Sequence, residues 1–254
     1  DLMKALITGA SSGIGRDMAR YLAKKGVFIY AVGRDTERLN ELKEELKDKC
    51  DVLSLDLSKR ENVFKLYENL KDSEIDIVIN NAGFGIFGGF DETSLETELE
   101  LIDTNIVALH ILTKLFYRDF IKKNKGYILN VASSAGFMAG PLLSSYYASK
   151  NYVLQLSKAI YEETRRKKKN VSISIFCPGP VKTRFNERAN VKFAIGGIES
   201  EYAAKYAIDK MFKRRLIIIP TLLMKTGIFL LRFISYKTAL KINWYFQRRK
   251  TNKK

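Results

Sequence analysis

The stretch "MKALITGASSGIGRDMARYLAKKG", Met3 to Gly26, contains the features that decide the fold class. Its opening segment "MKALITG" is a short apolar run that is typical of a buried strand. A glycine-rich turn follows, and apolar residues then recur at helical spacing until Gly26, which can end a helix. A buried strand, a glycine-rich turn and an amphipathic helix in direct succession predict the first unit of a layered α/β protein.

The same alternation of strand and helix patterns continues along the chain. Strand-like runs lie at 27–33, 50–57, 75–83, 126–133 and 171–179, and "RLIIIP" at 215–220 is a candidate for one more. Strands joined by helices that are long enough to cross over form a parallel sheet covered on both faces. We therefore expect a Rossmann-like, doubly wound parallel sheet of about seven strands with helices on both faces.

The positive charge of the chain is concentrated at its C-terminus. The 254 residues carry a formal net charge of +16, yet Lys213 to Lys254 contain twelve Lys or Arg and no Asp or Glu. The remainder is nearly balanced, which argues against a nucleic-acid-binding body. We expect one catalytic domain over residues 1–212, to which residues 213–254 add the last strand and a basic amphipathic helical extension.

Cysteine content and the start of the chain indicate the compartment. Cys50 and Cys177 match no metal or redox spacing, so two reduced cysteines are favoured over a disulfide, and no metal site is expected. The first strand pattern begins almost at residue 1, which leaves no room for a cleaved signal peptide. These features favour a cytoplasmic protein.

The turn "TGASSGIG", Thr8 to Gly15, has the composition of a phosphate-binding loop. Its glycines let the backbone turn tightly and approach a pyrophosphate at the N-terminus of the following helix. The second strand ends at Gly33 and is followed by Arg34, where an NAD site usually presents a carboxylate. A guanidinium there can pair with a 2′-phosphate, which favours NADP(H) over NAD(H). The nearby Asp35 and Glu37, and a purely solvated Arg34, leave the alternative open.

Five ordered motifs resemble those of the short-chain dehydrogenases/reductases in their compact one-domain branch. They are "TGASSGIG", "NNAG" at 80–83, Asn105, "SSAG" at 133–136 with "YYASK" at 146–150, and "PGPVKT" at 178–183. Each motif is common by itself, but their joint occurrence in this order is specific.

Two adjacent tyrosines precede a lysine in "YYASK". Tyr146 and Lys150 are i and i+4 on a predicted helix, and Tyr147 at i+3 also reaches the lysine, so helix geometry alone does not choose between them. An ammonium beside a phenol is expected to lower the phenol pKa from about 10 towards the working pH. The family pattern selects Tyr146, because Ser133 lies at the required distance before it, and leaves Ser134 and Tyr147 as neighbours.

The resemblance also implies roles for these residues. Tyr146 protonates a ketone oxygen, Ser133 hydrogen-bonds that oxygen, and Lys150 binds the nicotinamide ribose. Asn105 anchors a water that connects the lysine to solvent. The cofactor contacts implied by the loop and the family pattern, besides Tyr146 and Lys150, are Gly9, Ser11, Ser12, Gly13, Ile14, Gly15, Arg34, Asp56, Asn81, Ala82, Gly83, Pro178, Gly179 and Thr183.

Apolar side chains follow several of these motifs and indicate the substrate class. Phe84, Ile86, Phe87, Phe137 and Met138 are expected near the catalytic groups, which favours a hydrophobic ketone or aldehyde. The segment 184–197 occupies the place of the family's substrate lid.

The basic tail has three interpretations. It lacks the roughly 18 to 20 uncharged residues of a spanning helix, but aromatic residues followed by basic ones suit an amphipathic helix on an anionic membrane surface. Packing over the substrate pocket and formation of a subunit interface are the alternatives.

The sequence thus predicts an NADP(H)-dependent oxidoreductase that reduces a ketone or aldehyde to an alcohol. The rival hypothesis is an NADP-binding sensor or scaffold without significant turnover. Family resemblance further implies a homodimer or homotetramer, and nucleic acid is not an expected partner.

Overall fold

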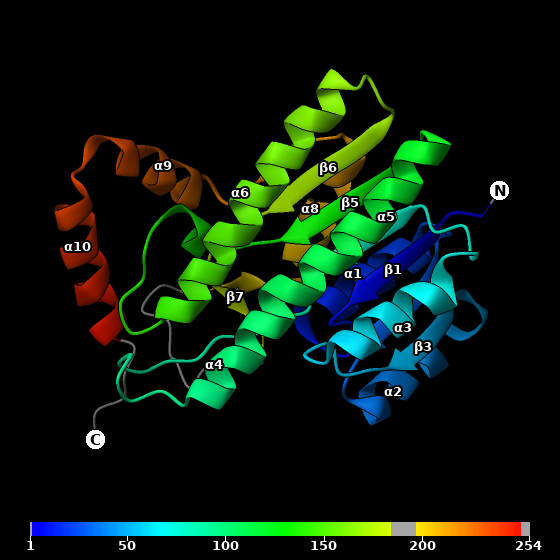
Figure 1. Cartoon of the computed structure of the whole chain (residues 1–254), viewed down its shortest axis with the longest axis horizontal. Helices are drawn as coiled ribbons and strands as arrows, with labels where there is room; N and C mark the ends of the chain where they lie inside the picture. Colours follow the sequence, from blue (N-terminus) through cyan, green and yellow to red (C-terminus); the bar gives the residue numbers. More distant parts are fainter. Residues whose placement is uncertain (1, 184–196, 250–254) are drawn as a thin grey trace.

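A parallel sheet forms the centre of the molecule. The computed structural model describes residues 2–183 and 197–249, and in this part seven strands pair in the order β3-β2-β1-β4-β5-β6-β9, all parallel (Figure 1). The strands are β1 Lys4–Thr8, β2 Phe28–Gly33, β3 Cys50–Ser54, β4 Ile77–Asn80, β5 Gly126–Val131, β6 Val171–Phe176 and β9 Ile217–Ile218. The Rossmann-like prediction is confirmed, and the segment "RLIIIP" supplies the seventh strand.

Helices cover both faces of this sheet. The helices are α1 Gly13–Lys24, α2 Thr36–Leu46, α3 Arg60–Leu70, α4 Leu95–Ile102, α5 Leu109–Lys123, α6 Ser144–Arg166, α8 Ser200–Phe212, α9 Leu222–Leu230 and α10 Tyr236–Arg248. One core layer packs α1, α2 and α8 against the sheet, and the opposite layer packs α3, α5 and α6. A short two-stranded ribbon of β7 Val181–Lys182 and β8 Ile198–Glu199 lies outside the main sheet.

Local sequence explains where these helices begin. Asp35 caps α2 by accepting a hydrogen bond from the backbone N–H of Arg38, and Ser94 caps α4 in the same way through Thr97. Such side-chain caps satisfy backbone donors that have no partner inside the helix. Each cap therefore fixes the point at which the chain leaves a sheet edge or loop and enters a covering helix.

A buried polar network ties α6 to the sheet. The amide nitrogen of Asn80 at the end of β4 donates to Asn130 Oδ1 in β5 at 2.8 Å and to Thr113 Oγ1 in α5 at 3.0 Å. Asn130 Nδ2 in turn donates to Ser157 Oγ in α6 at 2.9 Å. Hydrogen-bonded networks of this kind fix a single arrangement, because a broken member leaves a buried polar group unpaired.

The helical stretch that begins with α4 and ends with α5 is interrupted by a π-helical segment. This segment, Asp103–Ala108, joins α4 to α5 and carries Asn105 at its centre. Asn105 is fully buried, and its amide bonds to a neighbouring loop instead of the solvent. Single π-helical turns inside α-helices are frequent at functional sites.

The C-terminal appendage, residues 219–249, lies outside the sheet. Its helices α9 and α10 form the orange and red end of the chain beside the N-terminal end of α6 (Figure 1). Within the described residues no helix has both the length and the apolar character to cross a bilayer.

Candidate active site

A cavity of about 810 Å³ opens where the parallel strands end. Segments that follow β1, β2, β4, β5 and β6 contribute to its wall, and so do α6, α9 and α10. Binding at the carboxyl ends of the strands is the general rule for open α/β sheets. The volume lies in the usual range for a ligand site, roughly 300 to 1,000 Å³.

Nearly all the cofactor contacts predicted from the sequence line this one cavity. Those that do are Gly9, Ser11, Ser12, Gly13, Ile14, Arg34, Asp56, Asn81, Ala82, Gly83, Tyr146, Lys150, Pro178, Gly179 and Thr183. Gly15 does not line the cavity. A Cβ on Gly15 would approach the carbonyl oxygen of Gly9 and the amide of Asn81 to 2.4 Å, so this glycine serves close packing beneath the loop.

The loop after β1 presents the positive end of α1 to the cavity. Gly9 and Gly13 have φ values of +67° and +55°, a left-handed backbone that favours glycine. Ser12 is the N-cap residue, its side chain makes no capping hydrogen bond, and the first turn of α1 contains no acidic residue. The exposed backbone donors at this helix end are thus suited to a phosphate group.

Two guanidinium groups mark the cavity wall beyond β2. Arg34 lies there as predicted, and Arg38 from α2, which sequence reasoning missed, lines the cavity beside it. Arg34 Nη1 is 2.5 Å from Glu100 Oε1, and Arg38 Nε is 3.3 Å from Asp35 Oδ2. Both arginines are therefore held by carboxylates at the cavity edge. Arg38 lies in the first turn of the helix that directly follows Arg34, and this position was the signal that points to it.

Asp56 presents a carboxylate to the same region. Its Oδ1 accepts hydrogen bonds from the backbone N–H and the hydroxyl of Ser58, at 3.0 and 2.8 Å. Although burial opposes ionisation, these hydrogen bonds and the charge of Arg34 hold the pKa of Asp56 below its ordinary value. Asp56 is thus an ionised acceptor in the cavity wall.

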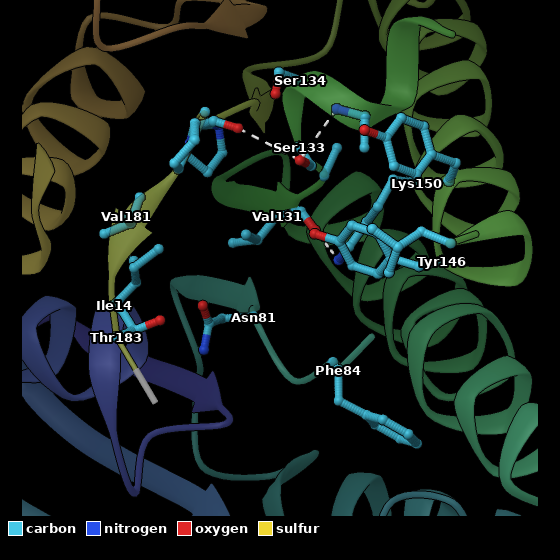
Figure 2. Close-up of a pocket in the computed structure, with 18 of the residues that line it drawn as sticks. Ile14, Asn81, Phe84, Val131, Ser133, Ser134, Tyr146, Lys150, Val181 and Thr183 are labelled. Carbon is cyan, nitrogen blue, oxygen red and sulfur yellow. Dashed lines mark hydrogen bonds between the residues drawn. The ribbon is translucent and has the colours of Figure 1, made fainter. Parts of the chain in front are cut away.

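The structure brings Ser133, Tyr146 and Lys150 together at the end of β5. Figure 2 shows the side chains of Tyr146 and Lys150 projecting from α6 into the pocket that Ser133 also lines, with the nitrogen of Lys150 reaching Val131. Lys150 is 5% exposed, its Nζ donates to the carbonyl oxygen of Val131 at 3.0 Å, and the ammonium lies 5.7 Å from the centre of the Tyr146 ring. Tyr146 shares a hydrogen bond with Ser133, whose hydroxyl also accepts from the Ala135 N–H at 3.1 Å.

The protonation equilibria of this pair differ from the sequence-based expectation. Burial raises the pKa of Tyr146 to about 12, against the opposing effect of its hydrogen bond with Ser133. Burial also lowers the pKa of Lys150 to about 8. The prediction that the lysine brings the tyrosine pKa down was therefore wrong for this cavity, because removal from water disfavours the charged form of both groups. Tyr146 is a neutral phenol at neutral pH.

Asn105 lies beneath the cavity and does not line it. Its amide nitrogen donates to the carbonyl oxygen of Phe84 and to Ser149 Oγ, and its oxygen accepts from the Phe84 N–H, at 2.9 to 3.0 Å. A Cβ on Gly83 would meet Asn105 Oδ1 at 2.9 Å and Lys150 Nζ at 3.4 Å. Asn105 thus clamps the loop that passes next to Lys150, and its predicted contact with a water stays a prediction.

Tyr147 is separated from Tyr146 by its partners. Helix geometry left the two tyrosines as alternatives, but Tyr147 turns towards the appendage, where Gln247 Nε2 donates to its hydroxyl at 2.5 Å. Asn243, which lies on α10 like Gln247, holds this helix in place by donating to the carbonyl oxygen of Ala139 at 2.7 Å. The structure therefore places Tyr146, and not Tyr147, next to Ser133.

The substrate side of the cavity is formed largely by the appendage. Of the apolar residues expected there, Phe84 and Met138 line the cavity, while Ile86, Phe87 and Phe137 do not. The appendage residues in the wall are Met224, Gly227, Ile228, Leu231, Ile234, Ala239, Ile242, Asn243, Phe246 and Gln247. The spacing of the last five, which places them on one helix face, was the signal for this role. The segment expected to be a lid is 184–197, and all of it except Gly197 lies outside the described residues.

Comparisons with known proteins agree with this geometry. The family model described as "short chain dehydrogenase" matches residues 3–192. An uncharacterised oxidoreductase of Staphylococcus epidermidis is 33% identical over 187 residues, which are 72% of this chain and 80% of that protein.

Two solved structures are similar over most of their length. A short-chain dehydrogenase from Sphingobium yanoikuyae in complex with NADPH is 30% identical with a TM-score of 0.82, covering 92% of this chain and 97% of that one. The bulky-bulky ketone specific alcohol dehydrogenase from Comamonas testosteroni is 28% identical with a TM-score of 0.77, covering 92% and 95%. With its fold, its motifs and these matches, the chain belongs to the short-chain dehydrogenase/reductase family.

Proposed function

We propose that this protein reduces a hydrophobic ketone or aldehyde to an alcohol with NADPH. Family membership makes it an oxidoreductase that acts on the CH–OH/C=O pair with a nicotinamide cofactor. The proposal adds the direction, the cofactor preference and the substrate class. The observation that carries it is a protonated, half-buried Tyr146 beside Ser133 and Lys150 in a cavity with an apolar outer wall.

The residues of the cavity fit a nicotinamide dinucleotide. The α1 N-terminus has the donors for a pyrophosphate, and Asp56 is an ionised acceptor for an amino group. When bound, the reduced nicotinamide supplies a hydride. The protein chain orients the two reactants and supplies the proton donor.

The proton comes from Tyr146. A phenol is protonated at neutral pH and burial raises the pKa of Tyr146 further, so its O–H is available to a carbonyl oxygen that accepts a hydride at carbon. Ser133 holds that oxygen by a second hydrogen bond, and the ammonium of Lys150 stabilises the phenolate left after transfer. A proton from solvent then restores the phenol, which completes the balance of one hydride and one proton per carbonyl.

Replacement of Tyr146 tests the assignment. We expect Tyr146→Phe to keep its affinity for NADPH and to lose at least about 100-fold in kcat, the usual contribution of a general acid. NADPH affinity is measured by fluorescence titration and turnover by NADPH oxidation with a panel of ketones graded by size. Wild-type protein that binds NADPH but oxidises it with no ketone favours the sensor hypothesis instead.

The preference for NADP(H) is supported by Arg34 and Arg38. Arg34 follows β2 directly, the carboxylate of Asp35 is paired with Arg38, and both guanidinium groups line the wall where a 2′-phosphate would lie. The NADPH complex of the Sphingobium relative is consistent with this preference. We expect Arg34→Ala/Arg38→Ala to raise KM for NADPH by about tenfold or more while KM for NADH stays unchanged. A wild-type preference for NADH contradicts the proposal.

The apolar wall supports a hydrophobic substrate. The side chains that α9 and α10 contribute to the cavity are mainly aliphatic and aromatic. The similarity to a dehydrogenase specific for bulky-bulky ketones points in the same direction. We expect kcat/KM to rise with the apolar area of the ketone, and a preference for small polar ketones contradicts this substrate class.

Self-association is part of the proposal. Leu95, Leu99 and Ile102 of α4 are exposed at 66%, 50% and 36%, which is an apolar surface suited to a second copy. We infer a homodimer or homotetramer, and sedimentation equilibrium of the full chain measures the molar mass.

A further inference from the structure

The outer face of the appendage is apolar and exposed. Of the twenty-one large hydrophobic residues exposed in the described part of the chain, twelve lie between Leu222 and Phe246. The most exposed are Leu222 at 77%, Phe233 at 72% and Tyr236 at 88%. Such a concentration of exposed apolar side chains in one short segment is typical of a site of interaction with a protein or a membrane.

Helix α9 is apolar on both faces. Its inner face, with Met224 and Ile228, lines the cavity, while Leu223 and Phe229 point away from it and are exposed at 68% and 54%. A helix that is apolar all round is normally buried on all sides. The inner face covers the cavity, whereas the outer face is exposed. The outer face therefore requires an apolar partner from outside the described part of the chain.

The charge of the appendage selects that partner. Basic side chains alternate with the exposed apolar ones, and Arg232 and Arg249 lie over the rings of Phe229 and Tyr245. Residues 219–249 contain six basic residues and no acidic residue. A symmetric contact with a second copy brings these charges together, which is repulsive, and a nucleic acid offers nothing to the aliphatic surface. An anionic lipid surface satisfies both the charge and the apolar side chains.

The exposed surface continues into the cavity. Ile234, Ile242 and Phe246 line the cavity and are also exposed at 37%, 45% and 46%. The appendage therefore has the cavity on one side and unpartnered apolar surface on the other, with these three residues at the border. A bilayer against the outer face thus lies next to the apolar entrance of the cavity.

We propose that α9 and α10 bind the surface of an anionic membrane and that the substrate enters the cavity from the lipid. The first part concerns binding alone. The second rests on the proposed function, because it identifies the substrate as a carbonyl compound that dissolves in the bilayer. Packing over the substrate pocket and binding to a membrane were alternative interpretations of the basic tail. In this proposal the inner face of the appendage does the first and its outer face does the second.

The single tryptophan makes the first part directly measurable. Trp244 is the only tryptophan of the chain, and it lies on α10, 46% exposed and outside the cavity wall. With vesicles of phosphatidylcholine and phosphatidylserine at 70:30, we expect co-sedimentation, a blue shift of its emission and quenching by brominated lipid. Phosphatidylcholine alone, or 0.5 M NaCl, is expected to reduce binding by about tenfold or more.

Two matched variants distinguish vesicle binding by the appendage from non-specific binding by exposed apolar side chains elsewhere. Leu223→Ser/Phe229→Ser/Phe233→Ser alters exposed side chains outside the cavity wall and is expected to lower vesicle partitioning by at least about tenfold. The control Leu2→Ser/Phe64→Ser/Phe90→Ser removes three exposed apolar side chains elsewhere and is expected to bind like the wild type. Circular dichroism and NADPH titration confirm that both triple variants are folded.

Four results overturn the membrane proposal. These are a wild type that binds no vesicles, equal binding to neutral and anionic vesicles, binding without any change in Trp244 emission, and an appendage variant that binds like the wild type. A molar mass that falls in the appendage variant assigns the surface to a second copy instead.

A substrate pair tests the second part separately. We expect the appendage variant to reduce water-soluble cyclohexanone at the wild-type rate and vesicle-dissolved 2-tridecanone at least about fivefold more slowly, because fewer molecules are docked. Equal rates on 2-tridecanone overturn entry from the lipid. If neither ketone is reduced by the wild type while vesicle binding persists, the proposed function fails and the membrane contact stands.

Discussion

Replacement of Lys150 by methionine is expected to stabilise the fold and to remove most activity. The lysine is buried, and burial lowers its pKa from 10.5 to about 8. At pH 7 the side chain is charged in both the folded and the unfolded state, so the folded state bears the cost of burying the charge. Methionine has a similar length and carries no charge, and it therefore removes this cost.

The magnitude follows from the shift. A pKa lowered from 10.5 to about 8 costs about 3 kcal/mol of folding free energy at pH 7 and about 1 kcal/mol at pH 10. The sign follows because the unfolded chain binds the proton more tightly, so stability rises with pH between the folded and the unfolded pKa. Methionine also loses the hydrogen bond to Val131, which costs about 1 kcal/mol at either pH. We expect Lys150→Met to be about 2 kcal/mol more stable than the wild type at pH 7 and about equal to it at pH 10.

Urea unfolding at pH 7 and pH 10, followed by circular dichroism, measures this difference. All other groups titrate alike in the two proteins, so the pH dependence of their difference reports Lys150 alone. Lys65→Met, which replaces an exposed lysine of α3, is the control and is expected to show no such pH dependence. A stability difference that is the same at both pH values, or a variant less stable than the wild type at pH 7, refutes the reasoning.

Three further predictions concern the same cavity. The kcat of carbonyl reduction is expected to fall as pH rises through about 8, because Lys150 loses its charge there while Tyr146, with a pKa raised to about 12, stays protonated; a flat profile from pH 6 to pH 10 contradicts this. Asn105→Ala is expected to destabilise the fold by about 3 kcal/mol in urea unfolding, since it removes a fully buried amide and leaves the backbone N–H and C=O of Phe84 without this partner. Tyr147→Phe is expected to retain kcat within about threefold, because this hydroxyl faces the appendage; a loss as large as that of Tyr146→Phe would reopen the choice between the two tyrosines.

The sheet could be predicted from the sequence because its signals are local. The central parallel strands are buried on both faces and read as largely apolar runs, and each crossover helix carries its own amphipathic spacing. Even the two-residue strand β9 left such a run in "RLIIIP". The π-helical turn at Asp103–Ala108 could not be predicted, because it depends on a hydrogen bond between Asn105 and a loop twenty-one residues away.

The candidate site could be predicted only in part from the sequence. The motifs follow the ends of strands, and the strand ends of a parallel sheet meet at one edge. Their order in the sequence therefore correctly predicted that the loop glycines, Ser133, Tyr146 and Lys150 share one cavity. The pKa values escaped this reasoning, since the proximity of two groups on a helix says nothing about how deeply the fold buries them. Burial turned an expected lowering of the Tyr146 pKa into a rise.

The sequence by itself determined the fold class, the phosphate loop and the order of the catalytic motifs, because these depend on residues close together in the chain. Only the tertiary structure showed that the helices of the basic tail form part of the cavity wall. Gln247 reaches Tyr147 across one hundred positions of sequence, and no local pattern specifies that contact. The same contact separates the two adjacent tyrosines, because it turns Tyr147 to the appendage and leaves Tyr146 with Ser133.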